Sequence, residues 1–218
     1  MELKVYFYFE LISLVASLFF YDRKGDKIIK YFVPFLFLTV AVEFVGLLWQ
    51  LDLRLKFSLY NIFTSIEFLF YAFLFYNHLK KPLLKRITLG FFPFFILLAI
   101  VNILFFQGLT KTFNTYTFLL GSFCIVVFCC FFFYESVLPD KIDSQLSMHP
   151  FFWISSGLLI YYLGSVIINA LFQYLTSNDL QIEGRRIYSI INNVLNVILY
   201  GSFCIAFFLC RNRKKKSL

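Results

Sequence analysis

The segment Phe113–Glu135 (FNTYTFLLGSFCIVVFCCFFFYE) contains no charged residue before its last position. A helix that crosses the hydrocarbon core of a bilayer needs about 20 consecutive, mostly apolar residues. The Phe-rich run near its end does not alternate between apolar and polar positions, as a strand of a membrane barrel would. The segment therefore predicts a transmembrane helix.

Six further segments of the same kind lie along the chain: Val5–Tyr21, Ile29–Gln50, Phe57–His78, Ile87–Phe106, Pro150–Leu175 and Ile187–Cys210. The composition agrees, since 61% of the residues are hydrophobic and 15% are charged, whereas a soluble domain carries about 25% charged residues. We expect an all-α polytopic membrane protein. Its seven transmembrane helices would form one bundle over residues 1–210, followed by a basic tail at 211–218.

The positions of Lys and Arg predict the orientation of this bundle, because short loops rich in these residues stay on the cytoplasmic side. Fourteen of the 20 lie on the side that holds Asp22–Lys27 with Lys30, Leu79–Arg86, Lys141 and the tail. The other six are Lys4, Arg54, Lys56, Lys111, Arg185 and Arg186. The N terminus is therefore predicted outside and the C terminus in the cytoplasm. Topology explains most of the net charge of +8, so no nucleic-acid partner is expected.

Two repeated patterns stand out. The pairs Pro34-Phe35, Pro93-Phe94 and Pro150-Phe151 lie near the starts of three expected helices, where proline costs no hydrogen bond. The pentapeptide Gly-Ser-Phe-Cys-Ile occurs at Gly121–Ile125 and again at Gly201–Ile205. Both patterns are compatible with a duplicated hairpin or with chance in so biased a composition.

Polar side chains recur within the apolar segments at the spacing of one helix face. The stripes are Tyr6, Glu10, Ser13, Ser17; Thr39, Glu43, Gly46, Gln50; Tyr60, Thr64, Glu67, Tyr71; Tyr162, Ser165, Asn169, Gln173; and Ser189, Asn193, Asn196, Tyr200. A polar side chain is costly in lipid unless it faces other helices or a wet cavity. With the predicted orientation, most of these residues fall in the outer half of the membrane.

We therefore predict a polar pocket near the outside, whose ligand-binding residues are Glu10, Glu43, Glu67, Asn102, Asn169, Asn192, Asn193 and Asn196. The competing interpretation is that the Asn and Ser side chains only hydrogen-bond across helices and hold them together. The carboxylates suit proton exchange, cation binding or a hydrogen bond to a ligand.

Several classes of membrane protein do not fit. The segment Ile187–Cys210 contains no Lys, so a retinal Schiff base as in rhodopsins is excluded. A zinc-dependent membrane hydrolase needs several ligands within the spans, whereas His78 and His149 lie at the predicted cytoplasmic boundary. No short catalytic or nucleotide-binding motif occurs. We expect no metal and no cofactor, and an enzyme is the less favoured class.

Three segments carry a resemblance: Asn61–Leu74 (NIFTSIEFLFYAFL), Phe152–Gly164 (FWISSGLLIYYLG) and Asn193–Phe203 (NVLNVILYGSF). With them the chain resembles small, uncharacterised seven-helix proteins of bacterial inner membranes. The resemblance implies the same location and brings no known activity.

The leading hypothesis is a non-enzymatic membrane protein that acts as a sensor or accessory subunit and binds a small-molecule ligand of unknown class in the polar pocket. Its expected partners are the lipid bilayer and a second membrane protein. A small proton-coupled transporter that uses Glu10, Glu43 and Glu67 as carriers is the alternative. The third hypothesis is an intramembrane lipid enzyme, with two of these carboxylates as acid and base.

Overall fold

The computed structural model describes residues 5–20, 29–48, 51–137, 146–177 and 181–216. These residues form seven α-helices and no strand: α1 Val5–Phe19, α2 Phe32–Leu48, α3 Leu53–His78, α4 Pro82–Val101, α5 Thr115–Val137, α6 Pro150–Ser177 and α7 Gln181–Lys216. A π-helical turn, Asn102–Phe106, continues α4. The predicted basic loop Asp22–Lys27, with Lys4, Gln50 and Lys141, lies outside the described residues.

The prediction of an all-α fold with seven helices is confirmed for the described residues. Five helical stretches are long and apolar enough to cross a membrane: Leu53–His78, Pro82–Phe106, Thr115–Val137, Pro150–Phe172 and Gly184–Cys210. The 15 residues of α1 and the stretch Phe32–Gly46 of α2 are also apolar but shorter. At 1.5 Å per residue α1 is roughly 22 Å long, against a hydrocarbon core of about 30 Å. The described helices are those of a multi-pass membrane protein.

The prediction that Pro93 lies near the start of a helix is wrong, because α4 begins at Pro82 and Pro93 lies in its interior. Helix formation depends on backbone hydrogen bonds and not on apolarity alone. The helix therefore extends through Lys85 and Arg86, which are good helix formers. An interior proline is tolerated in a membrane helix because neighbouring groups satisfy the freed carbonyl. Pro150, by contrast, is the first residue of α6.

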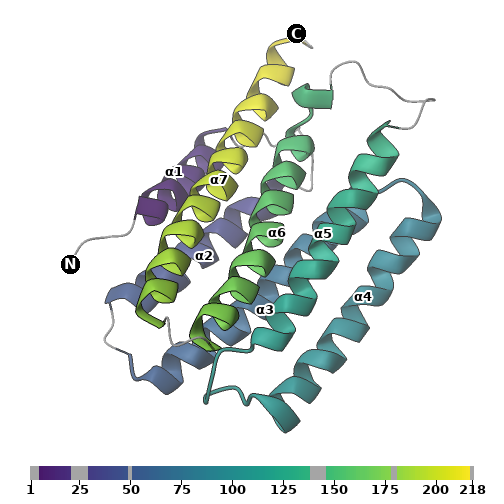
Figure 1. Ribbon diagram of the computed structural model, residues 1–218. Coiled ribbons are helices and arrows are strands. Elements are labelled where there is room, and N and C mark those ends of the chain that lie inside the picture. The colour runs from purple at the N-terminus through teal and green to yellow at the C-terminus, as the bar shows by residue number, and fades with distance from the viewer. Residues whose placement is uncertain (1–4, 21–28, 49–50, 138–145, 178–180, 217–218) are drawn as a thin grey trace. The chain divides into compact units, whose positions relative to one another are not determined.

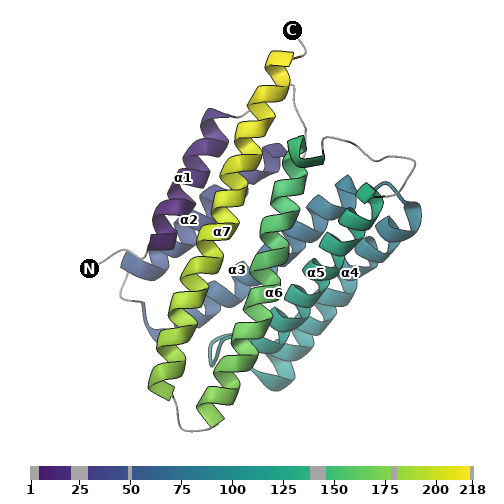
Figure 2. The ribbon, with the colours of Figure 1, turned by 45° about the horizontal axis from the view of Figure 1, so that its top comes forward.

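The chain divides into two compact units, residues 1–33 with 144–218, and residues 34–143. In the first unit α7 packs against both α1 and α6 (Figures 1 and 2). Two glycines of α6 allow α7 to approach closely. A Cβ at Gly157 would lie 2.8 Å from Cβ of Ser202, and a Cβ at Gly164 would lie 2.6 Å from Cδ2 of Leu195. Small residues bring membrane helices into close contact in this way.

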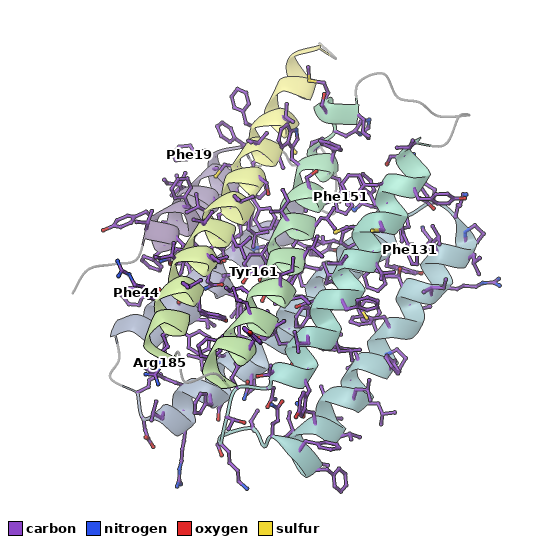
Figure 3. All side chains as sticks on the ribbon, in the orientation of Figure 1. Phe19, Phe44, Phe131, Phe151, Tyr161 and Arg185 are labelled. Atoms are coloured by element: carbon purple, nitrogen blue, oxygen red, sulfur yellow. The ribbon has the colours of Figure 1, made fainter. Side chains whose placement is uncertain are left out.

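Aromatic side chains of the first unit lie both in its interior and on its surface. The buried ring of Phe32, the first residue of α2, packs edge-on against Phe203 and Phe207 of α7, with ring centroids 5.2 and 5.7 Å apart. Phe19, at the end of α1 in Figure 3, is 81% exposed. Exposing such a ring to water costs free energy. Exposed rings of this kind are therefore ordinary on a surface that faces lipid.

In the second unit α3 packs against α4 and α5, which also contact each other. The ring of Phe68 lies directly on Gly121 of α5, where a Cβ would be 2.5 Å from the ring atom Cδ2. The same ring packs against Phe95 of α4, with the centroids 5.6 Å apart. The helix α2 contacts α3 through Phe35, which stacks on Phe70 at 3.9 Å. Among the described residues, phenylalanine is the commonest buried apolar side chain of this unit.

Candidate functional site

The predicted pocket residues belong to both compact units. The first unit contains Glu10, Asn169, Asn192, Asn193 and Asn196, and the second contains Glu43, Glu67 and Asn102. The single pocket predicted from all eight stays a prediction.

The polar stripe of α1 is buried and faces α7. Glu10 and Ser13 have no exposed surface, and Ser17 is 2% exposed. The side chain of Ser13 interacts with the thiol of Cys204 in α7. Since Glu10 lies one turn before Ser13 on the same helix face, its carboxyl group lies on the side of α1 that packs against α7. This places a carboxyl group inside the helix packing of the first unit.

The amides of α6 and α7 bond mainly within their own helices. Nδ2 of Asn169 donates to the carbonyl of Ser165 at 2.7 Å, and Nδ2 of Asn196 donates to the carbonyl of Asn192 at 2.8 Å. Donation to the carbonyl four residues earlier is an ordinary local solution for a polar side chain in a helix. One contact crosses between helices, from Asn169 to the side chain of Tyr188 in α7. Asn193, like Asn192, is half-buried.

In the second unit the stripes of α2 and α3 meet at Glu43 and Tyr60. The hydroxyl of Tyr60 donates to Oε2 of Glu43 over 3.5 Å. Gly46, one turn further along α2, leaves room for this tyrosine, because a Cβ there would collide with its hydroxyl. Glu67 is half-buried and lies two turns after Tyr60 on α3. The structure therefore pairs Glu43 with a phenol across two helices.

Asn102 belongs to a network that joins the end of α4 to the start of α5. Its Nδ2 donates to Oε1 of Gln107 at 3.0 Å and to Oγ1 of Thr117 at 2.9 Å. The same oxygen of Gln107 accepts the backbone N–H of Tyr116 at 3.2 Å. These bonds link the end of α4 to the start of α5. They are of the kind expected if the amides only hold helices together. Ligand binding by Asn102 stays a prediction.

Asn61 of α3 is hydrogen-bonded to the loop that precedes α5, and the polar stripes found in the sequence did not include it. Its Nδ2 donates to the carbonyls of Leu109 and Thr112, and its Oδ1 accepts the backbone N–H of Asn114, all at 2.9 Å. The loop turns at Gly108, whose φ of 72° suits a residue without Cβ. An amide in the first half of an apolar helix, together with a glycine in a later loop, was the available signal.

Among the described residues, no group of three or more His, Cys, Asp and Glu side chains could hold a metal ion. Nδ1 of His78 lies 2.9 Å from the carbonyl of Leu74 in its own helix.

No family model matches the chain, and no curated protein or solved structure matches it. The fold and composition define the class as a multi-pass α-helical membrane protein.

Proposed function

We propose that the chain is a seven-span protein of a bacterial inner membrane, with its N terminus outside, that acts as a non-enzymatic sensor or accessory subunit. The observation that carries this proposal is the length of α7, which is one unbroken helix of 36 residues from Gln181 to Lys216. Such a helix is roughly 54 Å long, whereas the hydrocarbon core is about 30 Å thick. It reaches beyond the apolar stretch Gly184–Cys210 into the basic tail.

The contacts of α7 support a role in transmission. Its first half carries the polar side chains Asn192, Asn193 and Asn196, and its last six residues include five cations. It packs against α1, which holds Glu10, and against α6, which holds Asn169. Helix shifts of about 1–2 Å are a common way to pass a conformational change between sites. A ligand that moves the outer half of α7 would therefore move its basic end.

The burial of Glu10 supports a ligand-binding role for the face between α1 and α7. A carboxyl group inside a membrane protein is costly and is retained chiefly for function. Glu10 has no exposed surface and lies beside Ser13 and Ser17. A small ligand that carries a hydrogen-bond donor or a positive charge fits this chemistry.

The packing of α3 favours sensing over proton transport. A transporter needs a polar path from Glu67 towards the other end of α3 at His78. The side chains of Phe68, Tyr71 and Phe75 fill the turns between them, and each is at most 1% exposed. Bulky side chains packed at this density leave little room for a water-filled path.

The topology is tested with reporter fusions in bacterial cells. We expect green fluorescent protein to be fluorescent at the C terminus, and alkaline phosphatase to be active when fused after Asp52 or after Lys111. An active phosphatase at the C terminus would contradict the proposed orientation. A fusion pattern with fewer than seven crossings would contradict the span count.

The sensor or accessory role is tested by crosslinking in native membranes. The full chain is expected to crosslink to one defined membrane protein, and deletion of 211–218 should remove that product while the chain still inserts. In proteoliposomes loaded with a pH-sensitive dye, the full chain should pass no protons after a pH jump. Proton flux that Glu10→Gln abolishes would establish the transporter instead.

A further inference from the structure

Three helix ends meet at one end of the second unit, where α3 and α5 end and α4 begins (Figure 1). Glu135, near the end of α5, accepts the backbone N–H of Lys80 at 2.8 Å and that of Lys81 at 2.7 Å. Hydrogen bonds from backbone N–H groups to a carboxylate are among the stronger ones in proteins. They hold the turn between α3 and α4 against α5.

Two lysines at the start of α4, Lys81 and Lys85, lie against tyrosine rings from neighbouring helices. Nζ of Lys81 lies 4.5 Å from the ring centroid of Tyr134 in α5, and Nζ of Lys85 lies 5.6 Å from that of Tyr76 in α3. A cation within about 6 Å of an aromatic centroid is attracted to the ring face. Because the two lysines are four residues apart, they share one face of α4. Both ammonium groups are therefore held at the junction of three helices.

The junction is positively charged. Lys80, Lys81, Lys85 and Arg86 contribute four cations, and Glu135 contributes one carboxylate. Both oxygens of Glu135 accept backbone N–H groups, so its hydrogen bonds do not occupy the lysine side chains. The four cations, called the basic junction below, leave a net positive charge at this end of the unit.

The basic junction lies at the ends of three helices that are long and apolar enough to cross a membrane. Its tyrosines are of the kind that gathers at headgroup depth, and basic residues between helix ends bind anionic headgroups. We infer that the basic junction binds the phosphate of an anionic phospholipid such as phosphatidylglycerol. This site is separate from the proposed sensing site and does not depend on it.

Native mass spectrometry of the full chain in a neutral detergent tests this inference, with dioleoyl phosphatidylglycerol and dioleoyl phosphatidylcholine as probes. Phosphatidylglycerol is expected to bind more tightly. The double variant Lys81→Gln/Lys85→Gln should weaken its binding by roughly 30-fold, since each cation near a membrane surface contributes a factor of about five and two are removed. Lys81→Arg/Lys85→Arg keeps both charges and should retain binding, which controls for misfolding.

The matched control is Arg185→Gln/Arg186→Gln, which removes two exposed charges at the start of α7 (Figure 3). This variant should leave phosphatidylglycerol binding unchanged. An equal loss in the control variant, or equal binding of phosphatidylcholine, would overturn the inference. Displacement of the lipid by glycerol 3-phosphate at the same concentration would also overturn it, because the site would then bind soluble phosphates. None of these outcomes depends on whether a membrane partner is found.

Discussion

The ring of Phe68 in α3 lies so close to the backbone of α5 that a Cβ at Gly121 would be 2.5 Å from its Cδ2 atom. Phe68 has no exposed surface and packs against the rings of Phe95 and Phe118. The ring therefore has little room to move aside. The glycine is required here by the close approach of two helices.

Gly121→Ala should lower the free energy of unfolding by about 1–3 kcal/mol, the usual cost of overpacking a core. The chain supplies its own control, because Gly201 begins the same pentapeptide and a Cβ there would meet nothing within 4 Å. Gly201→Ala should stabilise the protein by up to about 1 kcal/mol through helix propensity. Unfolding in mixed detergent micelles, followed by circular dichroism, measures both. Equal effects at the two positions would contradict the packing described here.

Asn61→Ala should destabilise the loop that precedes α5. The variant loses three hydrogen bonds, to Leu109, Thr112 and Asn114, at about 0.5–1.5 kcal/mol each. Trypsin cleavage after Lys111, which is exposed in this loop, gives a local readout and should become faster. Asn77→Ala is the control, because the side chain of Asn77 donates to the carbonyl of Phe73 in its own helix. Unchanged cleavage in Asn61→Ala would show that the loop is held by other contacts.

Gly157→Ala should loosen the contact between α6 and α7 at a cost of about 1–3 kcal/mol. The new Cβ would lie 2.8 Å from Cβ of Ser202, which cannot move without its backbone. In Gly157→Ala/Ser202→Gly that obstacle is gone, so the second change should restore part of the lost stability. A double-mutant cycle measures this coupling. Simple additivity of the two effects would argue against direct contact.

Glu135→Ala should release the turn between α3 and α4, at a cost of about 1–3 kcal/mol for the lost charge-assisted bonds. Glu135→Gln keeps one acceptor oxygen and should have a smaller effect. Hydrogen exchange of the amides of Lys80 and Lys81, measured by mass spectrometry, should speed up in the alanine variant. Ser58→Ala, which removes a hydroxyl bonded within α3, should leave this exchange unchanged.

The number of helices and their approximate places could be predicted from the sequence because long apolar runs dominate it. The ends of the helices were less predictable. The chain is already helical at Leu53, before Arg54 and Lys56, and α7 remains helical through Lys216. Charged residues with good helix propensity extend a helix beyond the stretch that lipid requires. Apolarity indicates the stretch that can lie in lipid, and local hydrogen bonding decides where the helix ends.

The ligand-binding role of the eight residues stays a prediction, whereas the hydrogen-bond partners of several of them can be compared with the polar stripes. The spacing within α2 and α3 correctly places Glu43 and Tyr60 on polar stripes, and the structure joins them. Asn102, chosen from its position alone, is instead bonded to Gln107 and Thr117. Asn61 was missed because its partners are backbone atoms of a loop, and side-chain periodicity carries no information about these. Which side chains form hydrogen bonds with each other depends on which helices and loops lie side by side in the fold. The spacing of residues along one helix does not contain this information.

Because α7 is one continuous helix, it can move as a rigid rod, so that a tilt at one end displaces the other. A tilt of about 10° at one end of a helix roughly 54 Å long displaces the other end by about 9 Å. Rotation is conveyed as well as displacement, because a continuous ladder of backbone hydrogen bonds resists internal twist. With Gln181 as the pivot, a shift of about 1 Å at Asn196 would displace Lys216 by roughly 2 Å, with no break in the helix between them.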